Sequence, residues 1–187
     1  MGESFVARGA AALRDFFASV DAGDLESAAS DIARRFSLPL DPDTDWTAVE
    51  YDFNRLFVGP AAVPAPPYAS AYQEGQEEPA LMRAPALEVR QAYALLGLVV
   101  PDQGAAPDDH LAFELDAAVA LESLAGTEDE MAALKKWLVA EHMAGWIPRF
   151  ASAVKGQEGV TAPVAMAVEA LAAWLEAARS GAGTAAA

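Results

Sequence analysis

Residues 107–124 read PDDHLAFELDAAVALESL, and this stretch decides the fold class. After the Pro-Asp-Asp start, apolar side chains recur at helical spacing on two faces: Leu111, Leu115 and Val119 on one, and Phe113, Ala117, Leu121 and Leu124 on the other. A helix that is apolar around so much of its circumference is normally buried among other helices. We therefore expect a central helix that opens at Pro107 or Asp108.

The segments on both sides of this helix also follow the helical period, and no alternating strand pattern of useful length occurs. The sequence therefore predicts an all-α fold, a single bundle of seven to nine helices that forms one domain over residues 1–187. A Gly/Pro/Asp-rich loop near residues 98–108 is expected to join the N-terminal and C-terminal helical parts like a hinge. Residues 180–187 are expected to form a frayed tail.

The charge of the chain limits the kinds of partner that it can bind. Its 12 Lys and Arg against 28 Asp and Glu give a formal net charge of −16. Such a surface repels nucleic acid and anionic lipid headgroups, so we expect neither nucleic-acid binding nor membrane insertion. There is no cysteine, and the longest apolar run, residues 92–100, is too short to cross a bilayer. The N-terminus does not resemble a signal peptide, so a soluble, cytoplasmic protein is predicted.

Enzyme chemistry has little support in the sequence. The two histidines, His110 and His142, are far apart and lack the spacing of zinc or di-iron ligands, so no metal or other cofactor is expected. Phosphate-binding glycine loops are absent as well. Asp108 and Asp109 beside His110 would permit acid/base catalysis, but an aspartate that caps the helix while His110 packs on a neighbour explains them more simply. The protein is predicted not to be an enzyme.

Three separated motifs occur together in this chain. Residues 51–72 read YDFNRLFVGPAAVPAPPYASAY, Pro107-Asp108-Asp109-His110 precedes the central helix, and residues 137–150 read WLVAEHMAGWIPRF. In this order the motifs resemble the TorD/DmsD/NarJ family of redox-enzyme maturation chaperones, most closely its TorD/DmsD branch. The resemblance extends over about residues 5 to 178.

The resemblance implies a cytoplasmic chaperone that binds the twin-arginine signal peptide of a molybdenum-cofactor oxidoreductase. Such a chaperone holds the catalytic subunit for cofactor insertion before Tat export. The family's peptide-recognition segment corresponds to Pro107, Asp109 and His110, and its Pro-Pro-aromatic segment to Pro66, Pro67 and Tyr68. Two positions depart from the family pattern, because Ala106 stands where Glu is usual and Tyr68 stands where many relatives carry Trp.

A cationic leader with an apolar stretch calls for carboxylates beside aromatic rings. Asp109, with Asp108, would meet the guanidinium groups, and His110 would orient Asp109 or donate to a peptide carbonyl. Tyr68 and Tyr72 would line the apolar part, although a loop-anchoring role fits them almost as well. The other aromatic candidates, Phe57, Tyr93 and the Trp146–Phe150 region with Pro148 in the first turn of a short helix, are expected to be core or packing residues.

Two alternatives stay open. A chaperone of the same fold could grip the mature enzyme subunit rather than its leader, and a small hydrolase could use Asp109 and His110. The client molybdoenzyme is not specified by the sequence. The chain is expected to be a monomer or a domain-swapped dimer formed through the loop before Asp108.

Overall fold

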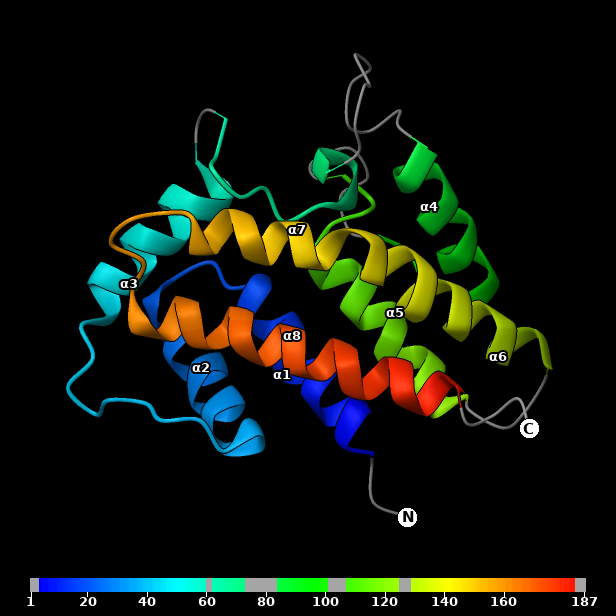
Figure 1. Cartoon of the computed structure of the whole chain (residues 1–187), viewed down its shortest axis with the longest axis horizontal. Helices are drawn as coiled ribbons and strands as arrows, with labels where there is room; N and C mark the ends of the chain where they lie inside the picture. Colours follow the sequence, from blue (N-terminus) through cyan, green and yellow to red (C-terminus); the bar gives the residue numbers. More distant parts are fainter. Residues whose placement is uncertain (1–3, 60–61, 73–83, 101–106, 125–128, 184–187) are drawn as a thin grey trace.

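The computed structural model describes residues 4–59, 62–72, 84–100, 107–124 and 129–183, which form eight α-helices (Figure 1). In chain order these are α1 (Phe5–Phe17), α2 (Ala22–Phe36), α3 (Trp46–Phe53), α4 (Ala84–Leu96), α5 (Leu111–Ser123), α6 (Asp129–Lys135), α7 (Ala144–Lys155) and α8 (Ala162–Gly183). Within the described part of the chain there is no β-strand, only an isolated backbone bridge between Tyr68 and His110. The predicted all-α bundle of seven to nine helices is confirmed.

Helix α5 is the central helix that the sequence predicts. It has buried residues around most of its circumference, and it packs most extensively against α1. The predicted start of this helix, at Pro107 or Asp108, was wrong, because the helix begins at Leu111. The capping residue is His110, whose Nδ1 accepts a hydrogen bond from the backbone N–H of Ala112 at 3.2 Å. Neither preceding aspartate caps α5, since both carboxylates bind other segments of the chain.

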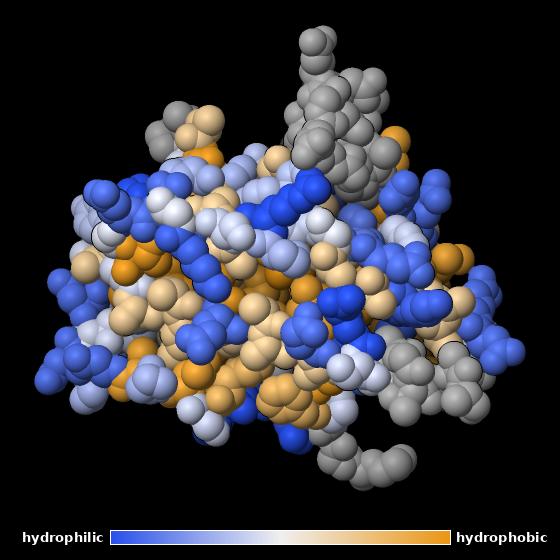
Figure 2. Space-filling model, viewed as in Figure 1, coloured by the Kyte–Doolittle hydropathy of each residue, from blue (hydrophilic) through white to orange (hydrophobic). Residues whose placement is uncertain are grey.

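Helix α8 packs along α1, α2 and α7. Trp174 on α8 is fully buried, and its indole N–H donates to the carbonyl of Val6 at 3.0 Å. Gly9 allows this close packing, because a Cβ at that position would lie 3.1 Å from both Phe36 and Trp174. Exposed alanines, Ala162, Ala165 and Ala173, lie along α8. Figure 2 shows pale orange surface mixed with blue on the face along which α8 runs.

Helix α3 continues into a π-helical turn, Asn54–Val58, which ends at Gly59, whose φ is positive (41°). Asp52 connects this region to the start of α8 through two hydrogen bonds. The Oδ2 of Asp52 accepts from the backbone N–H of Thr161 at 2.7 Å and from the Thr161 hydroxyl at 2.9 Å. Phe57, in the π-helical turn, is buried against Phe17 and Phe150, which confirms its assignment to the core.

Helices α6 and α7 are parts of one continuous helix, joined by a π-helical stretch, Lys136–Met143 (Figure 1). The expectation that Pro148 lies in the first turn of a separate short helix was therefore wrong, because Pro148 lies inside α7. Proline interrupts a helical hydrogen-bond ladder, and it is tolerated here just after a stretch in which the regular ladder is already altered. Pro148 is also exposed, so its ring does not disturb the core.

The connections and the tail are described only in part. Helix α4 is followed by Gly97 with φ 67°, and residues 101–106 of the expected hinge loop lie outside the described residues. Helix α8 continues through residues 180–183 of the expected frayed tail, while residues 184–187 also lie outside. In the described parts, no helix is both long and apolar enough to span a membrane.

Candidate functional site

The two segments that the sequence singles out lie side by side. Tyr68 and His110 form an antiparallel backbone bridge. Around it, the N–H of Ala69 donates to the carbonyl of Asp109 at 3.1 Å, and the N–H of Leu111 donates to the carbonyl of Pro67 at 2.8 Å. We call segments 67–72 and 107–110 the paired loops. They hold the start of α5 against the short 3₁₀ turn Ala69–Tyr72.

Asp108 and Asp109 are buried within the paired loops. Asp109 is fully buried, and its Oδ2 accepts from the N–H of Ser70 at 2.5 Å. Burial raises the pKa of the Asp109 carboxyl, against the opposing effect of its hydrogen bonds with Ser70. Asp108 accepts from the Nε of Arg90 on α4, and Arg90 is half exposed. Both carboxylates therefore bind groups of their own chain, and Pro67 beside them is also buried.

His110 has one ring nitrogen committed to the fold. Its Nδ1 is the acceptor that caps α5, so in the neutral ring the proton lies on Nε2. Burial lowers the pKa of His110 to about 4, so the ring is neutral at pH 7. A neutral ring with Nε2–H fits a donor to a peptide carbonyl.

The aromatic candidates separate into two groups. Tyr93 is buried, and its hydroxyl donates to the carbonyl of Asp108 at 2.9 Å, which confirms that it belongs to the core. Tyr68 and Tyr72 are partly exposed. Tyr72 stacks on Trp146 with ring centroids 5.8 Å apart and an interplanar angle of 20°.

Beside the paired loops lies a pocket of about 300 Å³ that the sequence did not predict as a site. We call it the aromatic pocket. It is built from the 3₁₀ turn, α4 and the continuous helix α6–α7, and its lining residues are Ala69, Tyr72, Glu88, Trp137, Glu141, His142, Gly145, Trp146 and Arg149. Tyr72 thus connects the predicted site with an unpredicted one. Trp146 does pack in the core as expected, but it also forms part of this wall.

A buried ionisable group from α5 lies behind the pocket wall. Glu114 is fully buried, and its two oxygens bind the Nε2 of His142 at 2.7 Å and the indole N–H of Trp146 at 3.1 Å. Trp137 stacks on His142 with centroids 5.3 Å apart. Burial raises the pKa of Glu114. Burial alone would lower the pKa of His142, but the charge and hydrogen bond of Glu114 outweigh it and raise that pKa.

Two sequence signals mark this cluster. Glu114 is a charged residue between apolar positions of a helix that is otherwise buried, and a buried carboxylate requires a partner. His142 and Trp146 are four positions apart, which places both on one face of a helix. The sequence does not say that these two features meet, since their contact depends on how α5 packs against α6–α7.

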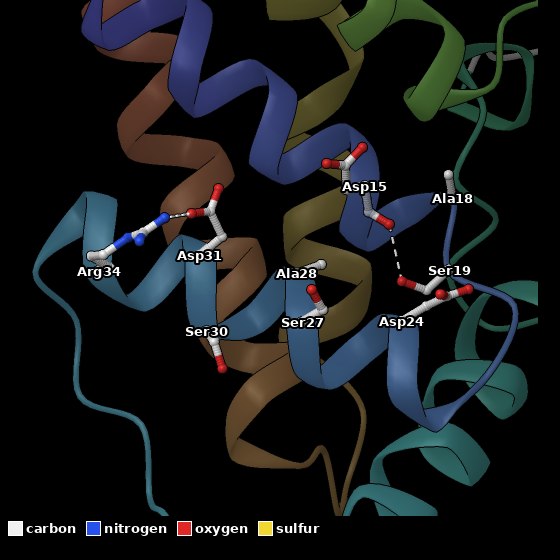
Figure 3. A pocket seen from close by; sticks show the side chains of 9 residues that line it. All are labelled: Asp15, Ala18, Ser19, Asp24, Ser27, Ala28, Ser30, Asp31 and Arg34. Carbon is white, nitrogen blue, oxygen red and sulfur yellow. Dashed lines mark hydrogen bonds and ion pairs between the residues drawn. The ribbon is translucent and has the colours of Figure 1, made fainter.

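A larger polar hollow of about 770 Å³ lies between α1 and α2 (Figure 3). Asp15, Asp24 and Asp31 line it together with several serines. Several polar groups there are paired: Asp31 with Arg34 and Arg35, the hydroxyl of Ser19 with the carbonyl of Asp15, and the carboxylate of Asp24 with the N–H of Val20. The hollow shares no residue with the paired loops. No group of three or more potential metal ligands occurs in the described part of the chain.

Comparison with known proteins identifies the family. Residues 6–152 match the model of the nitrate reductase delta subunit family. The chain belongs to this family. The matched region extends from α1 into α7 and includes the paired loops and the aromatic pocket. Family membership supports a chaperone role in molybdoenzyme maturation rather than catalysis. It does not select the TorD/DmsD branch within the wider group.

The fold of this delta-subunit family member is also similar to a solved structure. A protein from Archaeoglobus fulgidus, assigned as a redox enzyme maturation protein, superposes with a TM-score of 0.58. The two chains share 19% sequence identity, and the match covers 96% of this chain and 94% of the other. At this identity the similarity establishes the fold alone. No curated protein matches the sequence.

Proposed function

We propose that this chain is a cytoplasmic chaperone that binds the twin-arginine leader of a molybdenum-cofactor oxidoreductase and holds the catalytic subunit until its cofactor is inserted. The observation that carries the proposal is the backbone pairing around Tyr68 and His110. It joins the two segments that the resemblance assigns to peptide recognition. If both segments contribute to one peptide-binding surface, their presence together in one chain is explained.

The surroundings of the paired loops suit a leader that is cationic and then apolar. Tyr68 presents a partly exposed ring with a polar end beside the proline turn. Glu88 and Glu141, both exposed, add negative charge at the neighbouring pocket. A net charge of −16 attracts a cationic peptide from a distance.

The buried aspartates have distinct roles in this proposal. Asp109 holds segment 67–72 in place through the N–H of Ser70. Asp108 is paired with Arg90, whose side chain is 55% exposed. A leader guanidinium would bind Asp108 by taking the place of Arg90, which leaves this buried carboxylate paired throughout.

The direct test is isothermal titration of the protein with a synthetic leader containing two consecutive arginines and an apolar stretch. Tyr68→Ala removes the exposed ring but leaves the backbone bridge, so we expect binding to weaken about tenfold. Tyr51→Ala is the matched control, because Tyr51 on α3 is 76% exposed and outside the site. Unchanged helical circular dichroism establishes that both variants are folded. Failure of the folded wild type to bind the leader would refute the proposal.

A pulldown separates leader binding from the alternative of binding the mature subunit. The client subunit is presented with and without its leader at equal concentration. Leader recognition predicts that removal of the leader abolishes most of the capture. Full capture of the leaderless subunit would favour the alternative and would contradict the proposal.

A further inference from the structure

We propose that the aromatic pocket binds the side chain of one arginine of the leader. This inference rests on the proposed function and assigns a subsite within it. The occupant is a planar guanidinium group that enters the pocket lined by Tyr72, Trp137 and Trp146. The sequence suggested carboxylates for arginine binding, whereas this subsite is lined by aromatic rings.

The walls of the pocket suit a flat cation. Tyr72 is stacked on Trp146, and Trp137 is stacked on His142. Tyr72 comes from the 3₁₀ turn, and the other three rings come from the continuous helix α6–α7. Guanidinium groups stack on aromatic faces, where the negative charge of the ring face attracts the cation. A lysine ammonium has the same charge but lacks the flat shape, so the pocket favours arginine.

The hydroxyl of Tyr72 is a second, independent indication of a ligand. Its oxygen is buried and has no hydrogen-bond partner among the described residues. Burial is also the main cause that raises the pKa of Tyr72 far above its ordinary value, so the phenol is neutral. Such a group is costly to leave unpaired. Its oxygen is closed to solvent in the free protein, so a guanidinium N–H would supply the missing donor once the Tyr72 ring moves toward the pocket.

The charges around the pocket favour a cation over an anion. Glu114 and His142 form a buried pair and offset each other. Glu88 and Glu141 are exposed, and neither forms an ion pair within the described part of the chain. Among the described lining residues, Arg149 is the one cation apart from His142, and its guanidinium donates to the carbonyl of Tyr72 at 2.7 Å. Two exposed carboxylates against one guanidinium leave the described lining with a net negative charge.

The decisive variant is Tyr72→Phe, which removes the unpaired hydroxyl and retains the ring. In the free protein this change relieves the cost of burying that hydroxyl, so the melting temperature should rise by about 2–4 °C. Affinity for the leader should nevertheless fall roughly fivefold, since the oxygen accepts from the arginine only in the complex. A residue that served only the fold would not raise stability and weaken binding together.

A double-mutant cycle identifies the bound group. Glu141→Gln should weaken leader binding about two- to fivefold, and its effect should vanish with a leader whose arginines are replaced by glutamine. Glu26→Gln on α2 changes the net charge equally and is the matched control, for which we expect affinity close to wild type. A leader with lysines in place of both arginines should bind several-fold more weakly.

The outcomes separate the two proposals. If wild type binds the leader but Tyr72→Phe and Glu141→Gln bind it equally well, the pocket assignment is wrong and the proposed function stands. If Glu26→Gln weakens binding as much as Glu141→Gln, only diffuse charge is involved and the assignment is again wrong. If wild type does not bind the leader at all, both proposals fail.

Discussion

His110 caps the central helix α5, a structural role that the sequence did not predict. The sequence offers two aspartates as caps for the central helix, yet the cap is the ring nitrogen of His110. Aspartate is the stronger capping residue in general. Here Asp108 and Asp109 are bound to Arg90 and Ser70, and those contacts come from segments that sequence adjacency does not show.

The lowered pKa of His110 makes stability depend on pH. Between pH 6.5 and about 4 the unfolded chain takes up a proton at this ring and the folded chain does not, so stability falls as the pH drops through this window. Above pH 6.5 the ring is neutral in both states and has no effect. His110→Asn retains a capping acceptor and removes the titration.

We therefore expect wild type to lose roughly 1 kcal/mol more than His110→Asn in the free energy of unfolding between pH 7 and pH 5. Urea unfolding at the two pH values measures this difference. Glu114 and His142, whose pKa values the fold also raises, are present in both proteins, so their contributions cancel in the comparison. Equal losses in the two proteins would show that His110 is not held neutral by the fold.

The candidate site was only partly predictable at the residue scale. The resemblance marks Pro67, Tyr68 and the segment before α5, and the structure brings these together. Peptide binding by these residues stays a prediction. The aromatic pocket was missed because it depends on Glu114 meeting His142 and Trp146, and no local pattern encodes a contact between two helices that are distant in sequence.

At the scale of helices and their ends, helical periodicity predicted the fold class and the central place of α5. It did not predict that α6 and α7 are continuous, because proline normally indicates a helix start or a break. The π-helical stretch before Pro148 changes that outcome, and a repeat of apolar residues does not distinguish π from α turns.

The end of α2 gives a prediction at this scale. Ser37 adopts a left-handed conformation, with φ 55° and ψ 41°, at the position where helices commonly carry glycine. Ser37→Gly should stabilise the protein by about 0.5–1 kcal/mol, since glycine adopts this conformation without steric cost. Thermal unfolding measures the change. Ser37→Ala retains the Cβ and should give no such gain, and a similar gain from both variants would contradict the explanation.

At the scale of the whole molecule, the charge of −16 affects how a partner arrives rather than which partner is chosen. We expect the association rate with the leader to fall about tenfold when ionic strength rises from 0.01 to 0.15 M, while the dissociation rate changes less. Stopped-flow tryptophan fluorescence measures both rates. A leader with its arginines replaced by glutamine should show a much weaker salt dependence, and an equal dependence would argue against electrostatic attraction.

The pairing of Tyr68 with His110 also sets an order of events during synthesis. A chain is made from its N-terminus, so segment 67–72 leaves the ribosome before the residues that hold it in place exist. Helix α1 likewise waits for α5, its main packing partner. The far wall of the aromatic pocket, at Trp146, is made later still. A nascent copy therefore has no assembled pocket until Arg149, the last of the lining residues, has been added. Any ligand of this pocket must wait until the protein's own fold is in place.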